Sequence, residues 1–495
     1  MGIVRKQSIL SSIFIYAGFA IGAVNILLFF PKYFSPEQIG LTRILLDVAM
    51  VLATLCTLGS IPVTLRFFPF YRTYLPDNKN DLNYISLALG AIGSVLLLLL
   101  LPSMKPFIIR KFGARSPLFV EYFNLIYPFT ITIVFFTILE AHAWSQRKTV
   151  LSNALKEFAF RLLTTLLILL FISKVIDFDQ FIRSYAWIYL PATLAFVYAL
   201  SKGGNLRIRP TISTVTRRLK GKMASFGLFM FGGALLNIIA RTNDTIILAS
   251  QSSGGLSDAA VFTIATYLIT VMDVPQRSLV SISTPFIAEA WKNRSMEKID
   301  NLYRKTSLNL MIAGIAIFSL VLINMEDAVR FLGPEYSALT MIVLISGIAK
   351  LVDLATGLNT QILLLSKYWK VEFLTNILLV ALSIPLNYWL TKKYDVMGPA
   401  WGNLIALTVF NFTRFLLIWK LFGLQPFTMN HLRAVMIGIT ALAAGWMIPD
   451  TGNIYLNVFI RAVLFIPLFG WMVLRFKVSE DITGLMETLK ARLRW

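Results

Sequence analysis

The basic residues of this chain are sorted between its apolar segments. The apolar sequence falls into about fourteen stretches of membrane-spanning length, and Lys and Arg gather in every second gap between them. Because basic loops resist translocation, this bias predicts a polytopic membrane protein with a defined inside and outside. The stretches taken as cytoplasmic hold 31 of the 46 Lys and Arg residues and are the N-terminus, 64–81, 143–161, 201–222, 291–305, 366–370, 414–433 and 475–495.

Composition supports the same class of protein. The 495 residues are 57% hydrophobic and 14% charged, and the mean hydropathy is +0.71. A span needs about 20 apolar residues to cross a hydrocarbon core of about 30 Å, so the spans use most of the chain and leave no room for a soluble domain. A net charge of +21 would suggest nucleic acid in a soluble protein. Here the excess lies at the predicted cytoplasmic face, near anionic lipid, and no nucleic-acid partner is expected.

The expected fold class is all-α, a polytopic integral membrane protein with about fourteen transmembrane helices. An even number of spans leaves both termini cytoplasmic, and 478–495 is expected to form a short amphipathic helix on the inner membrane surface. The predicted spans are 9–30, 41–63, 82–104, 120–142, 158–174, 183–200, 224–249, 259–284, 307–325, 338–361, 371–390, 398–419, 432–449 and 454–474.

The loop from Lys202 to Lys222 carries seven basic residues and no acidic one, and it separates six spans from eight. Six is an even number, so the second half enters the membrane in the same direction as the first. Two halves of like orientation are related by an axis along the membrane normal, which is one of the repeat arrangements of transporters. The sequence therefore favours a carrier built from two parallel halves.

Charged residues lie inside several predicted spans. A charge near mid-bilayer costs several kcal/mol, so by default it indicates a polar cavity. Acid and base three or four residues apart share one helix face and can neutralise each other. Arg461 is alone in the last span, while Glu140 and His142 close the fourth. Four acid–base pairs have this spacing: Arg43 and Asp47, Arg241 and Asp244, Asp273 and Arg277, and Lys350 and Asp353.

Two interpretations of these charges stay open. The pairs can simply hold helices together or snorkel to an interface, which we favour for Arg43, Glu140 and His142 because they lie near span ends. For the pairs deeper in the second half, a water-filled path is favoured. Pro275, between Asp273 and Arg277, is expected to kink its helix, as moving transporter helices often do. Paired charges with an excess of Arg suit a bulky anionic solute, because guanidinium binds phosphate in a bidentate manner.

Enzyme signatures are missing from the sequence. It contains no Walker A loop, no His-Glu-x-x-His and no Gly-x-Ser-x-Gly. The two histidines are far apart, so a His-based metal site is not expected, and Asp177-Phe-Asp179 is taken as an ordinary loop. The translocated loops are short, the longest being 105–119, and a membrane enzyme acting on lipid-linked sugars usually needs a larger one. We therefore expect neither an enzyme nor a cofactor.

Three local strings carry a resemblance to a known family: Phe331-Leu-Gly-Pro-Glu-Tyr336, Leu386-Asn387 and Tyr394-Asp-Val-Met-Gly398-Pro-Ala400. They resemble the polysaccharide transporter branch of the multidrug/oligosaccharidyl-lipid/polysaccharide exporter superfamily. Family members have glycine where this chain has Asp395 and alanine where it has Pro399. Asn237 and Asp244 also resemble the polar pattern of the family's seventh span.

The resemblance implies two six-helix bundles, here 1–210 and 211–425, followed by two extra helices and a cytoplasmic tail in 426–495. Family members flip undecaprenyl-pyrophosphate-linked oligosaccharides across the bacterial inner membrane for O-antigen, capsule or exopolysaccharide assembly, many of them using ion gradients. The expected partners are the lipid-linked oligosaccharide, membrane lipids, a polysaccharide polymerase and a chain-length regulator. On this basis the substrate-binding candidates are Arg241, Arg277, Lys350 and Arg461, and the ion-coupling candidates are Asp244, Asp273 and Asp353.

Other functions remain open from the sequence. A drug/cation antiporter or a lipid II flippase of the same superfamily would share the fold, although the excess of basic candidates disfavours cationic drugs. A membrane polysaccharide polymerase or ligase is disfavoured by the short outer loops, and a scaffold would not explain the buried charges. The sequence identifies neither the sugar nor the coupling ion.

Overall fold

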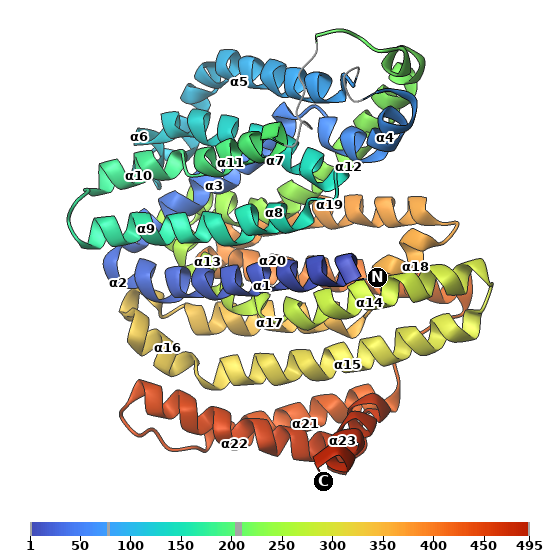
Figure 1. Ribbon diagram of the computed structural model, residues 1–495. Coiled ribbons are helices and arrows are strands. Elements are labelled where there is room, and N and C mark those ends of the chain that lie inside the picture. The colour runs from blue at the N-terminus through green and yellow to red at the C-terminus, as the bar shows by residue number, and fades with distance from the viewer. Residues whose placement is uncertain (1, 77–79, 203–209, 494–495) are drawn as a thin grey trace. The chain divides into compact units, whose positions relative to one another are not determined.

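The computed structural model describes residues 2–76, 80–202 and 210–493 (Figure 1). Within these ranges the chain forms helices and no strand. Each of the fourteen predicted spans is mostly helical, although 41–63, 183–200 and 338–361 are each divided between two helices. This confirms the expected fold class. The positions Lys79, Arg207, Arg209 and Arg494, which contributed to the charge bias, lie outside the described residues. By its contacts the chain divides into two compact units, 1–260 and 261–495.

The first unit is built almost entirely of helices. Short π-helical segments, η1 (Asn25–Phe29) and η4 (Ala154–Ala159), interrupt its first and fifth spans. Its helices are α1 (Gly2–Val24), α2 (Phe30–Tyr33), α3 (Pro36–Cys56), α4 (Ser60–Tyr74), α5 (Leu82–Phe112), α6 (Pro117–Glu121), α7 (Ile126–Ser145), α8 (Thr149–Asn153), α9 (Phe160–Ile172), α10 (Phe178–Ala186), α11 (Tyr189–Lys202) and α12 (Thr214–Gln251), and α13 (Leu256–Thr270) contains the boundary between the units.

Helix α3 forms the centre of the first unit, packed against α5, α7 and α12. Its apolar residues Leu41, Ile44 and Leu45 are fully buried, as their helical spacing on one face requires. A capping box between Ser35 and Gln38 starts the helix by satisfying two backbone N–H groups. Helix α1 runs along η4, α8 and α9 on another side of the same unit.

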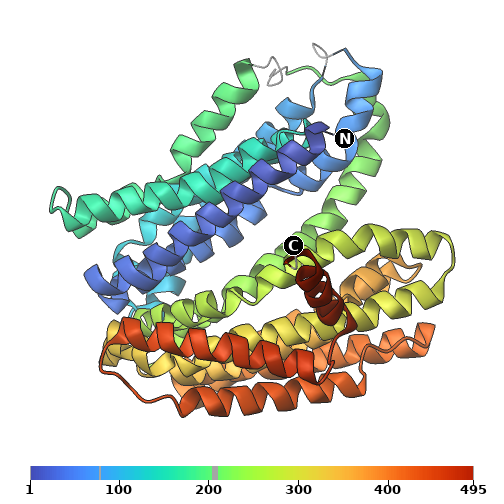
Figure 2. The ribbon, with the colours of Figure 1, turned by 60° about the horizontal axis from the view of Figure 1, so that its bottom comes forward.

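The second unit is also helical. Helices α15, α21 and α22 lie side by side in both views, and α23 turns away from α22 at the end of the chain (Figure 1 and Figure 2). The helices are α14 (Asp273–Lys292), α15 (Met296–Ile323), α16 (Met325–Leu332), α17 (Leu339–Ala355), α18 (Asn359–Leu365), α19 (Trp369–Tyr394), α20 (Gly398–Phe422), α21 (Met429–Trp446), α22 (Ile454–Arg475) and α23 (Glu480–Leu493), with 3-10 turns at Pro334–Tyr336 and Asp395–Met397.

Length and composition identify the helices able to cross a membrane. In the described ranges nine are long and apolar enough, or up to ten if the bent pair α13 and α14 counts as one span. One of the nine stretches, Trp369–Phe422, contains both α19 and α20. Other predicted spans coincide with shorter helices, such as α9 with 13 residues. The chain is thus a multi-pass membrane protein, while the bundle boundaries at 210 and 425 stay predictions.

Helices α19 and α20 form a closely packed hairpin, and the residues that carry the family resemblance explain why. A Cβ on Gly402 would lie 1.9 Å from the Asn387 side-chain oxygen, and one on Gly398 would lie 2.2 Å from the Thr391 backbone nitrogen. Asn387 is fully buried and donates to Asn403 at 3.3 Å. Small residues let the two backbones approach, as is common between membrane helices.

The turn between these helices contains strained backbone. Asp395 has φ of 54° and ψ of −129°, a conformation that glycine adopts at no steric cost and other residues rarely adopt. This is the position at which family members carry glycine. The departure from the family pattern therefore stores backbone strain of about 1–3 kcal/mol.

Replacing Asp395 by glycine is expected to raise the free energy of unfolding by about 1 kcal/mol, because the strain exceeds the entropy that glycine adds to the unfolded chain. Denaturant titration of the purified protein in detergent measures this change. Asp395→Ala is the matched control, since it removes the carboxylate but keeps the Cβ atom and should give no gain. A glycine variant no more stable than the alanine variant would contradict the strain argument.

Arg461, the one charged residue of the last predicted span, has a partner on another helix. Its guanidinium donates to the Asp327 carboxylate at 2.7 Å and to the Ile323 carbonyl at 2.8 Å, which joins α22 to α16. Arg461 and Asp327 are only 7% and 1% exposed. Arg330 also pairs with Asp327 and with Asp450, and the Arg330 guanidinium holds the pKa of the Asp450 carboxyl well below its usual range. Asp327 lies 134 positions before Arg461, so no helical spacing in the sequence could indicate that the two pair.

Removing one member of the pair leaves an uncompensated buried charge. Arg461→Met and Asp327→Leu should each lower the free energy of unfolding by about 3 kcal/mol, while the double variant should lose at least about 1 kcal/mol less than the sum of the two. Thermal and denaturant unfolding of the four proteins measures the coupling. Strict additivity would show that the pair does not stabilise the fold.

Candidate functional site

The break between α13 and α14 positions the first candidate residue. The two helices meet at 47°, and the span predicted over 259–284 is bent as expected. Pro275 lacks an N–H group and its ring clashes with the carbonyl four residues earlier, so α13 ends at Thr270 and α14 begins only at Asp273. Asp273 therefore lies in the first turn of α14, where the positive end of the helix dipole favours a carboxylate.

Lys350 of α17 binds two carboxylates at once. Its ammonium lies 2.6 Å from an Asp273 oxygen and 2.9 Å from an Asp353 oxygen, and it donates to the Gln276 side-chain oxygen at 2.8 Å. Three donors are all that an ammonium has. The predicted pair of Lys350 and Asp353 is confirmed, and the structure adds a link from α17 to α14 that helical spacing could not show.

Arg277 completes the charge balance of this cluster. Its guanidinium lies 3.9 Å from Asp273, one turn back on α14, and its side chain is 72% exposed. Lys350, Asp273 and Asp353 have side chains only 18–25% exposed. Two cations thus balance two carboxylates, and the more exposed cation is held at the edge of the cluster. We call Asp273, Arg277, Lys350 and Asp353, with Gln276, the Lys350 cluster.

A chain of polar side chains extends from the Lys350 cluster into α18 and α20. The Asn411 amide donates to Asp353 at 3.4 Å. Its oxygen accepts hydrogen bonds from the Thr356 hydroxyl at 3.0 Å and from the Asn359 amide at 3.1 Å. Thr360 in turn donates to Asn359 at 3.3 Å. These residues are mostly buried, so the network satisfies polar groups that would be costly inside a membrane protein.

The network ends at a second ion pair, between Arg414 of α20 and Glu372 of α19. The guanidinium donates to Glu372, to the Thr360 hydroxyl at 2.7 Å and to the Thr375 hydroxyl at 3.0 Å. Arg414 is 3% exposed and Glu372 is 7% exposed. This pair was not predicted from the sequence, because Arg414 was assigned to the cytoplasmic stretch 414–433. Asn411 and Arg414, three residues apart inside a predicted span, were the available signal.

The remaining candidates lie elsewhere in the chain. Arg241 is exposed and Asp244 is half-buried on α12, which belongs to the first unit. The next residue, Thr245, donates to Asp47 at 2.5 Å, and Asp47 pairs with Arg43 at 2.8 Å. The pair lies within α3, and the Thr245 hydrogen bond to Asp47 links α3 to α12, which agrees with the structural interpretation favoured for Arg43. The roles of Arg241, Asp244 and Arg461 in substrate or ion binding stay predictions.

Glu140 and His142 are also held inside the first unit. Glu140 accepts from Ser152 at 2.8 Å and pairs with Lys156 at 3.1 Å, which links α7 to α8 and η4. The ring of His142 shares a hydrogen bond of 2.7 Å with Ser86 of α5. Both residues are buried. Their contacts connect helices, as the sequence analysis favoured for them.

Solved structures similar to this chain are membrane transport proteins. An inward closed structure of the lipid II flippase MurJ superposes with a TM-score of 0.75 at 14% identity, covering 94% of this chain and 98% of that one. An inward-facing multidrug resistance MATE family transporter of the MOP superfamily gives a TM-score of 0.64 at 17% identity, covering 82% and 94%. A Vibrio cholerae MATE transporter gives 0.55 at 15% identity, covering 85% and 96%.

No protein-family profile matches the chain, and no curated protein matches it at the level of sequence. The similar structures are all below 25% identity, so they establish the fold alone. That fold is the polytopic helical fold shared by the lipid II flippase and the MATE transporters of the MOP superfamily.

Proposed function

We propose that the protein moves a lipid-linked oligosaccharide, carried on undecaprenyl pyrophosphate, across the bacterial inner membrane for O-antigen, capsule or exopolysaccharide assembly. The observation that carries this proposal is the Lys350 cluster, in which two half-buried carboxylates and an ammonium meet an exposed guanidinium on a broken helix. The exposed guanidinium of Arg277 would bind a pyrophosphate or an acidic sugar through paired hydrogen bonds. The fold supports the proposal because its neighbours include a lipid II flippase.

The cluster offers a route for coupling transport to an ion gradient. An anionic substrate that binds Arg277 and Lys350 competes with Asp273 and Asp353 for those cations. A carboxylate that loses its cation is costly in a low-dielectric site, so it takes up a proton or a sodium ion instead. Because Lys350 joins α14 to α17, the exchange also loosens one helix from the other. The break before Asp273 allows α14 to move, as hinges at element ends do.

The proposal also covers the location of the protein, its transport cycle and its partners. The protein would lie in the inner membrane with both termini cytoplasmic and would alternate access between the two faces. Its partners would be the lipid-linked oligosaccharide and membrane lipids, together with a polysaccharide polymerase and a chain-length regulator.

Two other transport functions use the same fold. Lipid II flipping is favoured by the similarity to MurJ, with a TM-score of 0.75. Antiport of drugs or cations is favoured by the MATE structures. An organic cation would have to displace Lys350 or Arg277 from two carboxylates that they already neutralise. This charge balance favours an anionic substrate over a cationic one.

The proposal predicts that the purified protein in vesicles moves a fluorescent undecaprenyl-pyrophosphate oligosaccharide between leaflets. Arg277→Gln should slow this movement about tenfold, because losing a hydrogen bond between charged groups costs about 1.5–3 kcal/mol and about 1.4 kcal/mol is a factor of ten. Arg183→Gln, in an exposed pair with Asp179 on α10, is the matched control and should leave the rate unchanged. Movement of lipid II but not of the oligosaccharide, or full activity of Arg277→Gln, would contradict the proposal.

Ion coupling is tested with imposed gradients in the same vesicles. Wild-type flipping should accelerate under a proton or sodium gradient, and Asp353→Asn should remove that acceleration because the amide cannot exchange a cation. The Asn411 hydrogen bond to position 353 can persist in the variant, which limits structural damage. Equal acceleration of Asp353→Asn and wild type would exclude Asp353 as the coupling residue.

A further inference from the structure

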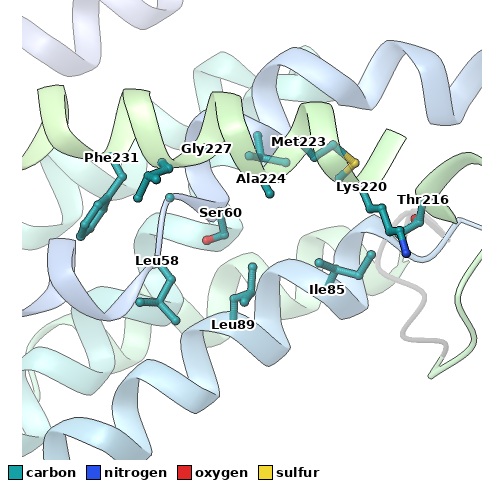
Figure 3. Close-up of a pocket in the computed structure, with 13 residues that line it drawn as sticks. Leu58, Ser60, Ile85, Leu89, Thr216, Lys220, Met223, Ala224, Gly227 and Phe231 are labelled. Atoms are coloured by element: carbon teal, nitrogen blue, oxygen red, sulfur yellow. The ribbon is translucent and has the colours of Figure 1, made fainter. Parts of the chain in front are cut away.

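A long cavity in the first unit lies between α4, α5 and α12, apart from the Lys350 cluster. Its volume is about 500 Å³, within the range of about 300–1,000 Å³ typical of small-molecule sites. Figure 3 shows Lys220 and Thr216 at one end and Phe231 at the other. The walls between the two ends are almost wholly apolar and include Leu58, Val63, Ile85, Leu89, Met223 and Leu228.

One face of α12 forms the length of the cavity. Thr216, Lys220, Met223, Gly227 and Phe231 recur every three or four residues, so they share a side of the helix. The fifteen helical steps from Thr216 to Phe231 span about 22 Å at the rise of an α-helix. Half of a bilayer's hydrocarbon core is about 15 Å deep. The slot is therefore long enough for one acyl chain of a single leaflet with its headgroup.

Two glycines, Gly59 and Gly227, lie where α4 and α12 approach each other beside the cavity. A Cβ on Gly59 would lie 2.7 Å from the Gly227 carbonyl oxygen, and one on Gly227 would lie 2.9 Å from a Val63 methyl group. Gly59 also has φ of 75°, which favours glycine at the turn before α4. The two glycines therefore allow α4 and α12 to approach closely beside the cavity.

The polar groups of the cavity are arranged as an amphiphile would require. Lys220 is exposed and makes no ion pair within the described ranges. The first turns of α12 contain no acidic residue that could neutralise Lys220; their other basic residues, Arg217, Arg218 and Lys222, do not line the cavity. The carboxylate of Asp81 is fully buried behind Thr216, where it accepts from the Ser213 N–H and the Thr216 hydroxyl, and it does not line the cavity.

Ser60 provides an independent indication of a ligand. Its side chain is 98% buried, since the residue is 2% exposed, yet its hydroxyl has no hydrogen-bond partner among the described residues. Ser60 lines the cavity opposite Ala224 (Figure 3), and rotation about its Cα–Cβ bond would turn the hydroxyl toward a ligand bound there. A buried hydroxyl without a partner is costly, and a ligand carbonyl would satisfy it. Along α12, Ala224 and Gly227 lie four and seven residues beyond Lys220, which is about 6–10 Å. This is the separation along the helix between the basic end of the cavity and the level of Ser60.

We propose that this cavity is a binding site for an anionic phospholipid of the cytoplasmic leaflet, with the phosphate at Lys220, an ester carbonyl at Ser60 and an acyl chain running toward Phe231. The order of cation, hydroxyl and apolar slot matches the order of groups in a glycerophospholipid. Anionic lipid is favoured because the polar end is basic and its residues Thr216 and Lys220 belong to the predicted cytoplasmic stretch 201–222. The inference does not rest on the proposed substrate, because a resident lipid would bind whichever molecule is transported.

Native mass spectrometry of the delipidated full-length protein tests the site, with phosphatidylglycerol and phosphatidylethanolamine of identical chains as probes. Wild type should bind phosphatidylglycerol at least about fivefold more tightly. Lys220→Gln should reduce that affinity about fivefold, as expected for one Lys near a lipid phosphate. Lys222→Gln is the matched control, because Lys222 has the same charge two residues away but does not line the cavity, and it should change the affinity little.

Two further variants examine the interior of the slot. Ala224→Trp should fill the cavity and abolish tight binding of both lipids, and Leu89→Phe provides a milder filling if the first variant does not fold. Ser60→Ala should lower the affinity for ester-linked phosphatidylglycerol about fivefold. The affinity for the ether-linked analogue, which lacks the carbonyl, should be unchanged. Helix content and elution volume report folding for each variant. Equal losses in Lys220→Gln and Lys222→Gln, or unchanged binding after the slot is filled, would overturn the proposal by showing adsorption to the basic surface.

Discussion

The second unit depends on one ammonium shared between two carboxylates. Lys350 lies 2.6 Å from Asp273 and 2.9 Å from Asp353, so it neutralises both and links α14 to α17. Without it, two carboxylates would face each other in a mostly buried site, at a cost of several kcal/mol. The same ammonium is the group that an anionic ligand would attract. The interaction that stabilises the helix pair is thus also the one that binding would disturb.

The course of the backbone brings Lys350 and its two carboxylates together. The break at Pro275 allows Asp273 to begin α14 and to reach α17, while the close α19–α20 hairpin holds the second ion pair of Arg414 and Glu372. Asn411 and its hydrogen-bonded neighbours connect the two ion pairs across α18 and α20. A satisfied polar network of this kind has few alternative arrangements, because each lost contact leaves a buried group without a partner. A change at one ion pair is therefore expected to affect the other.

Sequence reasoning could predict the elements of this fold that arise from local physics. Apolar stretches of about 20 residues indicated helices at each predicted span, and three- or four-residue spacing indicated the pairs Asp273 with Arg277 and Lys350 with Asp353. Contacts between helices were beyond its reach. Arg414 with Glu372 and Arg461 with Asp327 are joined by tertiary packing over 42 and 134 positions, for which one sequence holds no periodic signal. The same reason explains why the cavity beside Ser60 was not expected, since three separate helices form it.

The coupling free energy between Asp273 and Lys350 tests the central claim most directly. It is obtained from the unfolding free energies of wild type, Asp273→Asn, Lys350→Met and the double variant in one detergent. A shared ammonium predicts that the double variant loses at least about 1 kcal/mol less than the sum of the single losses. Additivity within about 0.5 kcal/mol would show that the two side chains do not depend on each other, and would contradict the account.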